Sequence, residues 1–204
     1  MIAVMTDDIA SPADGETLQD RTRARIVAAA ARLLAEGGRE ALTTRSVSGA
    51  ADVQAPTIYR LFGDKRGLLD AVAEHGFASY LEEKTGRAPG ADPVEALRAG
   101  WDLHVAFGLA NPAIFAIMYG DPQPDRRSSA DVLAQSILRQ HVRAVAAAGR
   151  LRVSEARATD MIRAAGCGTV FMLLGMPAES RDMGLSTAMR DATMAAIATD
   201  VAQT

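Results

Sequence analysis

Eight side chains between residues 43 and 66 have the chemistry of a phosphate-binding surface. Hydroxyl groups donate hydrogen bonds to phosphate oxygens, and basic groups supply the countercharge. The eight residues are Thr43, Thr44, Arg45, Thr57, Tyr59, Arg60, Lys65 and Arg66. Lys65 is one of only two lysines in the chain, so it is not part of a general lysine-rich surface. The alternative is that Tyr59 is a packing residue and that Arg60 and Arg66 are solvated surface charges.

Two short helices, expected to end at Ala51 and near Phe62, would position these side chains. Thr43 or Thr44 can cap the first helix, and a turn follows at Asp52. Ala55-Pro56 opens the second, because proline in a first turn gives up no needed N–H group. Two short helices joined by a tight turn are typical of a helix-turn-helix. Its small core would consist of Val47, Ala50, Val53 and Ile58.

The start of the second short helix is the expected site of base contacts. In a helix-turn-helix the first residues of the recognition helix reach base edges in the major groove. These residues are Gln54, Ala55, Pro56 and Thr57. Thr44 before them and Lys65 after them would hold the DNA backbone on both sides of one groove. A plain three-helix packing element is the alternative reading.

The distribution of charge supports this segment as the nucleic-acid site. The net charge of the whole chain is −3, which taken alone argues mildly against nucleic acid. Residues 1–19 hold four acids and no Lys or Arg, whereas residues 20–70 hold nine Lys or Arg against six acids. The positive excess therefore falls on the segment that carries the phosphate-binding residues, and it is modest enough that geometry must contribute to recognition.

Composition and periodicity predict an all-α fold. Ala and Leu favour helices, and aromatic residues make up only 4% of the 204 residues. Together with the two short helices, apolar periodicity and helix-start signals predict about nine helices and no strand. Residues 1–19 lack periodicity and are expected to form a disordered acidic tail, and residues 87–92 resemble a linker. The remaining predicted helices span about 20–37, 64–86, 93–110, 112–119, 128–148, 154–174 and 186–201.

Several functional classes receive no support from the sequence. Cys167 is the only cysteine, so neither a disulfide framework nor a cysteine-based zinc site is expected. His75, His104 and His141 do not share metal-ligand spacing. No apolar run reaches a membrane span, and the acidic start is no signal peptide, so a cytoplasmic protein without a membrane partner is expected. We find no nucleophile elbow, phosphate loop or acid–base pair, which argues against an enzyme, and we predict no cofactor or metal.

The run from Thr43 to Val72 resembles the DNA-binding domain of TetR/AcrR-family transcriptional repressors. The resemblance covers residues 20–73 closely and the remainder only in architecture. Asp52 stands where the family usually has glycine in the turn, and aspartate tolerates the left-handed conformation better than most residues. The matching parts are Thr43/Thr44 with Arg45, the Ala51-Asp52-Val53 turn, Thr57-Ile58-Tyr59, Phe62, and Lys65 with Leu68-Leu69.

The resemblance implies two domains and a ligand-controlled function. Residues 20–66 would form the DNA-binding domain, and residues 67–204 a helical ligand-binding and dimerisation domain. The protein would repress transcription as a homodimer on a pseudo-palindromic double-stranded DNA operator, and a small hydrophobic effector would release it. The bulky residues available for the effector pocket are Trp101, His104, Phe107, Phe115, Met118, Tyr119, Phe171 and Met172. Ordinary core packing is the alternative for each of them.

Small residues on the last two long helices would form a four-helix dimer interface, because they allow helices to approach closely. Packing within one chain is the alternative. The predicted interface residues are Ile162, Gly166, Thr169, Val170, Leu173, Ala188, Ala192, Ala195 and Thr199.

Two other functions remain open at this point. One is a regulator of the same fold that activates transcription or responds to a protein effector. The other is a helical small-molecule-binding protein or enzyme with a vestigial helix-turn-helix. Sequence-specific, salt-dependent DNA binding would exclude the second, and its release by a small molecule would argue against the first.

Overall fold

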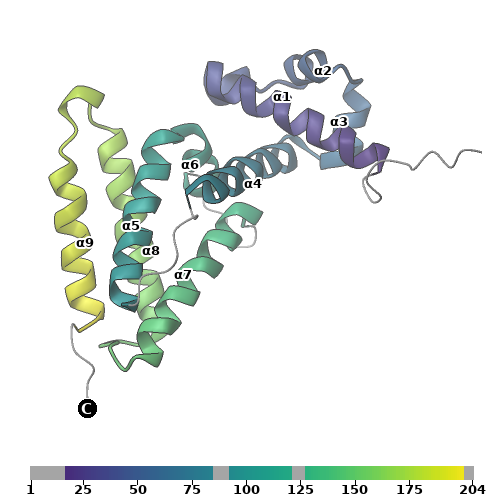
Figure 1. The fold of residues 1–204 in the computed structure, drawn as a ribbon. Helices are drawn as coiled ribbons and strands as arrows, with labels where there is room; N and C mark the ends of the chain where they lie inside the picture. The colour runs from purple at the N-terminus through teal and green to yellow at the C-terminus, as the bar shows by residue number, and fades with distance from the viewer. Residues whose placement is uncertain (1–16, 85–91, 121–126, 200–204) are drawn as a thin grey trace, which may run out of the picture.

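The computed structural model describes residues 17–84, 92–120 and 127–199, and these residues form an all-α fold (Figure 1). The predicted fold class is confirmed. The predicted tail and linker fall mainly outside the described residues. The elements are α1 (Leu18–Ala41), α2 (Thr44–Ala51), α3 (Ala55–Phe62), α4 (Lys65–Lys84), α5 (Pro93–Ala110), α6 (Pro112–Tyr119), α7 (Ser129–Ala147), α8 (Glu155–Leu174), the 3₁₀ turn η1 (Ala178–Ser180) and α9 (Met183–Ile197).

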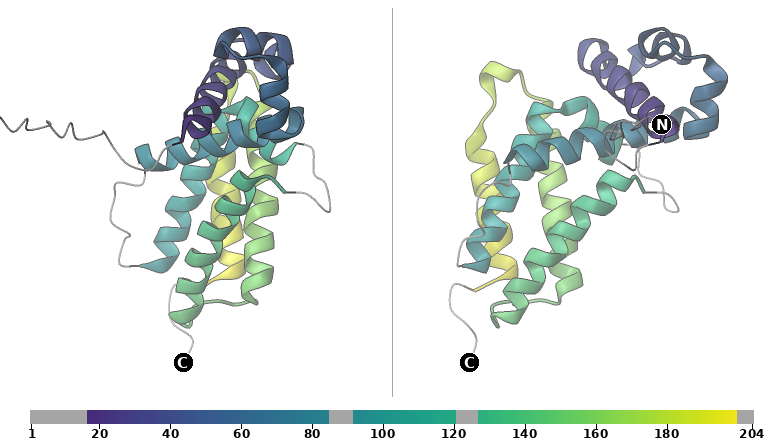
Figure 2. Two further views of the ribbon diagram at one scale, coloured as in Figure 1. Left: turned by 90° about the vertical axis from the view of Figure 1, so that its right-hand side faces the viewer. Right: turned by 45° about the vertical axis from the view of Figure 1, so that its right-hand side comes forward.

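The helices form two groups joined by α4 and α6. Helices α1–α3 lie together at one end of the molecule, and α5, α7, α8 and α9 lie together at the other (Figures 1 and 2). Each group has its own hydrophobic core. Helix α4 contributes Leu68, Leu69 and Val72 to the first core, and Ala73 and Phe77 to the second. The two cores therefore meet inside α4, later than the predicted domain start at residue 67.

Local capping explains most helix boundaries. Thr43 caps α2 by accepting a hydrogen bond from the Ser46 amide, and Asp92 caps α5 by accepting from the amides of Val94 and Glu95. Helix α1 is interrupted at Gly38, whose φ of 65° is non-helical, in line with the predicted end at Gly37-Gly38.

The starting residue of α9 differs from the prediction. The helix begins at Met183, three residues before the predicted start, because the Asp182 side chain accepts a hydrogen bond from the Gly184 amide and caps it.

The first core differs from the prediction at one residue. Val47 and Ile58 are buried and Val53 packs against them, as expected. Ala50, however, is exposed, and Ala51 occupies the buried position instead. The prediction for Ala50 is therefore wrong, because Ala51, the last residue of α2, is the one that packs into the core with α1 and α3.

The predicted dimer stripe on α8 is also wrong. Its members Ile162, Gly166, Thr169, Val170 and Leu173 are all buried within one chain. A Cβ at Gly166 would lie 3.3 Å from the His104 ring of α5, which shows that this face of α8 packs against α5. These residues cannot meet a second subunit while the second core is intact.

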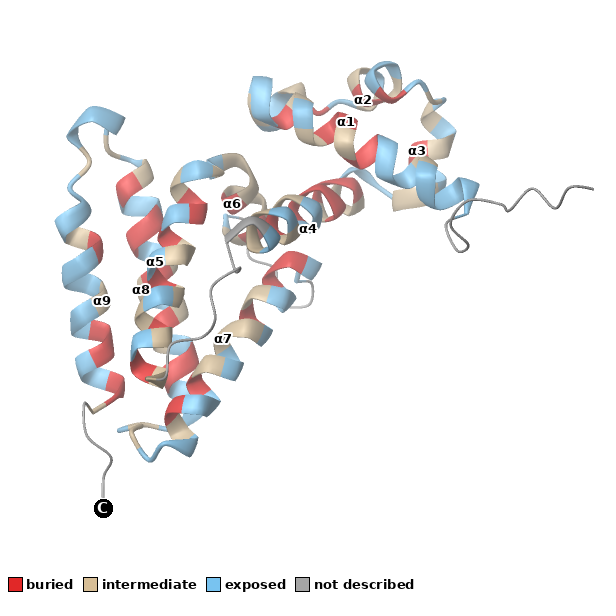
Figure 3. Cartoon of the chain, viewed as in Figure 1, coloured by how far each residue is buried: buried red, intermediate tan, exposed pale blue. Residues whose placement is uncertain are grey.

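Helix α9 keeps a free outer face. Ala188, Ala192 and Ala195 are exposed, as a surface stripe requires, whereas Thr193, Met194 and Ile197 are buried (Figure 3). Thr199 is half-buried and its amide donates a hydrogen bond to the Arg150 carbonyl, so it belongs to the intrachain contacts.

Among the described residues no single helix has both the length and the apolar character of a membrane span. Helices α5 and α6 reach this length and apolar character only when they are taken together, and the chain bends by 111° between them.

The turn between α2 and α3 yields a stability prediction. Asp52 is the only described non-glycine residue with positive φ, at φ 49° and ψ 55°. A side chain with a Cβ is disfavoured there, so we expect Asp52→Gly to match or exceed the wild type in free energy of unfolding. Asp52→Ala should lie about 1 kcal/mol below Asp52→Gly. Urea unfolding measures both, with exposed Asp160→Ala as the control. Equal stability of the Gly and Ala variants would show that the left-handed turn is not required.

Candidate nucleic-acid interface and the helical-domain cluster

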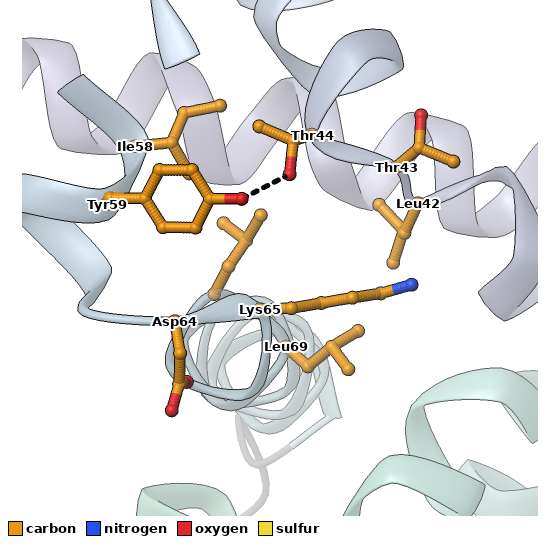
Figure 4. Close-up of a pocket in the computed structure, with 9 residues that line it drawn as sticks. Leu42, Thr43, Thr44, Ile58, Tyr59, Asp64, Lys65 and Leu69 are labelled. Atoms are coloured by element: carbon orange, nitrogen blue, oxygen red, sulfur yellow. Dashed lines mark hydrogen bonds between the residues drawn. The ribbon is translucent and has the colours of Figure 1, made fainter. Parts of the chain in front are cut away.

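Four of the eight predicted phosphate-binding residues line one shallow pocket at the junction of α2, α3 and α4. These four residues are Thr43, Thr44, Tyr59 and Lys65. The Tyr59 hydroxyl lies 3.1 Å from the Thr44 Oγ1 atom, within hydrogen-bonding distance (Figure 4). The structure thus brings together residues that are up to 22 positions apart in the sequence.

The polar donors of the pocket suit an anion, and the Asp64 carboxylate in the same lining accepts a hydrogen bond from the Gly67 amide. The amides in the first turn of α2 have no intrahelical partner apart from the cap, so this helix end carries partial positive charge. Thr44 and Tyr59 add hydroxyl groups, and exposed Lys65 adds a full positive charge at the start of α4. A backbone phosphate would meet donors from three helices here.

The start of α3 is free to contact bases. Gln54 is the N-cap residue, it is exposed, and its side chain makes no capping hydrogen bond. Pro56 is exposed and Thr57 half-buried, while Ile58 is buried and holds the helix to the core. The polar end of α3 is therefore presented outward by an anchored apolar side.

The remaining predicted DNA contacts lie at the surface of the same unit. Arg45 and Arg60 are exposed, and Ala55 is half-buried. One stabilising contact was not predicted: the Arg23 guanidinium lies 5.3 Å from the centre of the Phe62 ring and joins α1 to the end of α3. Only the spatial proximity of the two helices identifies this contact.

The predicted effector-pocket residues separate into core and cluster members. Trp101 is buried and donates a hydrogen bond from Nε1 to the Ser186 hydroxyl at 3.1 Å. Phe107 packs against Phe77 and Tyr80, with ring centres 5.1 Å apart in each pair. Met118 is also buried in the second core. For these three residues the core-packing alternative describes the structure.

Met172 does not line a pocket between the helices. Its side chain is 61% exposed, because it lies on the outer face of α8. The prediction for this residue is therefore wrong.

Four of the predicted residues form an aromatic cluster between α5, α6 and α8. Phe115 lies at its centre, with ring-centre distances of 5.3 Å to His104, 4.7 Å to Tyr119 and 5.3 Å to Phe171. Phe171 is 39% exposed, so the cluster reaches the molecular surface there.

A group of charged residues, which was not predicted from the sequence, lies beside this cluster. Asp131 of α7 is buried and pairs with Arg163 at 2.8 Å and with Arg127 at 2.6 Å. Arg127 also donates to the Gln135 side chain. The Ser128 cap reveals the start of α7, but the partner Arg163 is 32 residues away and no local signal connects them.

Burial controls the ionisation of the cluster. It lowers the pKa of His104 to about 4, with a smaller contribution from the positive charge of Arg163. Burial raises the pKa of Cys167 to about 11, and it raises the pKa of Tyr119 above its usual value. The Cys167 thiol, 4.0 Å from His104 Nε2, is thus protonated and a poor nucleophile at neutral pH. Among the described residues, no group of three or more His, Cys, Asp or Glu side chains could hold a metal ion.

Helix α6 contacts both halves of the molecule. Its Ile114 and Ile117 side chains pack against both hydrophobic cores, while Phe115 and Tyr119 belong to the aromatic cluster. A Cβ at Gly76 of α4 would overlap Ile114, so the two helices approach closely at this point. The aromatic cluster is therefore one helix away from the DNA-binding unit.

An exposed recognition helix held by a small three-helix core is the hallmark of a helix-turn-helix DNA-binding protein. Comparison with known proteins identifies this unit. Residues 26–72 match the family described as "Bacterial regulatory proteins, tetR family", so this segment of the chain is a DNA-binding domain of the TetR type.

Individual relatives agree with this assignment. The chain is 43% identical over 67 residues to the class A tetracycline repressor protein from transposon 1721 of Escherichia coli, covering 33% of this chain and 30% of the relative. It is 34% identical over 92 residues to the transcriptional repressor KstR of Rhodococcus jostii, covering 45% of this chain and 41% of the relative. Both alignments thus span less than half of the relative's length.

The whole fold is also shared with solved structures. The structure of RolR in complex with its ligand resorcinol is similar with a TM-score of 0.68 and 21% sequence identity. The match covers 90% of this chain and 89% of that one. At this identity the similarity establishes the fold.

The buried imidazole gives a pH prediction. Because the folded state lowers the pKa of His104 from 6.5 to about 4, the unfolded chain binds more protons between these values, and stability falls as pH decreases through that window. His104 should contribute about 2 kcal/mol to the loss of unfolding free energy between pH 7.5 and pH 5. Urea unfolding at both pH values should show a smaller loss for His104→Gln than for the wild type.

His75 is exposed, and His75→Gln is the matched control. Between pH 7.5 and pH 5 this variant should lose as much unfolding free energy as the wild type does. An unchanged pH dependence in His104→Gln would contradict the neutral, buried imidazole.

Proposed function

We propose that this chain is a homodimeric transcriptional repressor of the TetR family that a small molecule releases from its operator. The observation that carries the proposal is the pocket at Thr44, Tyr59 and Lys65 beside the exposed start of α3. This arrangement presents phosphate-binding groups and base-reading groups on one side of a single domain. The two relatives that are similar in the DNA-binding segment are both repressors, which supports repression over activation for this chain.

Two recognition helices are needed to read a pseudo-palindromic operator, so the proposal includes a dimer. The exposed side of α8 and α9 is the proposed interface. It combines Ala164, Gly168 and Met172 of α8 with the Ala188 and Ala192 face of α9. A Cβ at Gly168 would have no neighbour within 4 Å in the monomer, so none of the residues that the structure describes covers this position.

The proposed effector site is the aromatic cluster around Phe115. The RolR structure, which has the same fold, contains resorcinol, and this supports a small-molecule ligand for the present chain. A ligand that separates α6 from α8 would move Ile114 and Ile117 against α4 and so reorient the DNA-binding unit. The ligand must bind the reoriented state more tightly, and DNA must then weaken ligand binding by the same factor.

Lys65 and Gln54 should have different effects on DNA binding. Lys65→Ala should weaken binding to all sequences, because its contact is to phosphate. It should also reduce the slope of log affinity against log salt by about two, one contact per subunit. Gln54→Ala should instead change the preferred operator sequence, because glutamine reads base edges. Selection of bound sequences from a random library, followed by salt titrations on the selected operator, measures both effects.

Arg139→Ala, which changes an exposed residue of α7 in the other group of helices, is the matched control for lost positive charge. An unaltered salt slope in Lys65→Ala together with an unaltered sequence preference in Gln54→Ala would refute the assigned interface.

The dimer surface gives a second prediction. Gly168→Glu should leave the protomer folded, because the new side chain enters open space. It should nevertheless convert the dimer to a monomer, because it places a charge where two helices would approach closely. Light scattering coupled to gel filtration measures the mass, and operator affinity should fall with it.

Ala144→Glu adds the same charge to an exposed position of α7 and should remain dimeric. A dimeric Gly168→Glu protein would exclude this face of α8 from the interface.

A further inference from the structure

The charged group next to the aromatic cluster has more positive than negative charge. Arg127 and Arg163 both pair with the single carboxylate of Asp131. Among the residues that the structure describes, no other carboxylate pairs with either guanidinium. The His104 imidazole is neutral at physiological pH, so it does not change the balance. Within the described residues this group therefore combines two guanidinium groups with one carboxylate.

The two arginines differ in how far they are already used. Arg127 donates from Nε to the Asp131 carboxylate and from its amino groups to Gln135 and the Asp131 carbonyl. Arg163 uses one amino group, Nη2, for Asp131 at 2.8 Å. A guanidinium presents five N–H donors, so the Arg163 fork has capacity for a second carboxylate in paired geometry.

Arg163 lies one helical turn before Cys167, whose Sγ atom is 4.0 Å from His104 Nε2 in the aromatic cluster. Its charge acts on the ionisation of His104, Tyr119 and Cys167, which come from three different helices. Its side chain is 30% exposed, so an entering ligand can reach it without breaking the Asp131 pair. A positive group and packed rings thus meet at one place, where an aromatic ligand would bury its ring and a carboxylate on that ring would pair with the guanidinium.

From this juxtaposition we infer that the effector is an aromatic molecule carrying one carboxylate, held by Arg163 and stacked in the cluster of His104, Phe115 and Tyr119. The inference rests on the proposed function, because it names the ligand class for the same site. A carboxylate should therefore bind more tightly than a neutral aromatic ligand of the same shape, because the neutral ligand cannot pair with the Arg163 guanidinium.

Three matched pairs of compounds test the inference: benzoate and benzamide, phenylacetate and phenylacetamide, and 1-naphthoate and 1-naphthamide. The members of a pair have nearly the same shape and differ in charge. Calorimetry on the full chain without DNA, at about pH 7.5, measures each affinity. In at least one pair the carboxylate should bind about tenfold or more tightly than the amide, as expected for a charge-assisted hydrogen bond.

Variants of α8 assign this preference to Arg163. Arg163→Met should abolish the preference for the carboxylate, and Arg163→Lys should retain part of it. Arg157→Met, an exposed arginine on the same helix, is the matched control and should behave as the wild type. If circular dichroism shows Arg163→Met to be unfolded, Arg163→Gln replaces it, because it can still hydrogen-bond Asp131 without the charge.

Two results would overturn the inference: no pair in which the carboxylate binds more tightly, or a preference that persists without the Arg163 charge. Either would leave the Arg127–Asp131–Arg163 group as a structural tie between α7 and α8. Operator release is scored separately. Release by the amides alone would overturn the ligand class but keep the repressor. Arg163-dependent binding of a carboxylate that leaves operator affinity unchanged would overturn effector-controlled release but keep the ligand class.

Discussion

The contact between α4 and α6 is the constraint on which the rest of the molecule depends. Helix α4 supplies side chains to both hydrophobic cores, and α6 touches both through Ile114 and Ile117. The absence of a side chain at Gly76 lets the two helices come together. Packed interfaces of this kind shift between discrete arrangements and do not deform continuously. The orientation of the recognition helix is therefore tied to the position of α6.

The two candidate sites have opposite physical character. The DNA-binding surface is exposed, and its hydroxyl and basic groups lie in water, where they can be exchanged for phosphate contacts at little cost. The helical-domain cluster is buried, and burial lowers the pKa of His104 and raises those of Tyr119 and Cys167. Charge in that environment is expensive unless it is paired. Arginine accordingly occurs in two settings: Arg45 and Arg60 are exposed to water, whereas Arg127 and Arg163 both pair with the buried Asp131.

The sequence predicted those parts of the fold that depend on neighbouring residues. Thr43, Asp92 and Ser128 cap helices by bonds to amides within three residues, and a short window of sequence contains everything needed to recognise them. Residue type and spacing on two short helices also gave the proposed DNA contacts, of which Thr43, Thr44, Tyr59 and Lys65 line one pocket. The misplacement of burial by one position at Ala50 and Ala51 arose because small residues carry little periodic signal.

Long-range packing could not be predicted in this way. Helix α8 is apolar on more than one side, with Gly166 and Val170 facing α5 and Gly168 and Met172 facing outward, so periodicity alone does not distinguish core from surface. Burial of Asp131 depends on Arg163, a residue of another helix.

The contribution of α4 to the first core has a consequence for protein engineering. A DNA-binding unit cut at residue 66 would lack Leu68, Leu69 and Val72. A chimera that joins this unit to another helical domain must therefore include the N-terminal half of α4 with the DNA-binding unit.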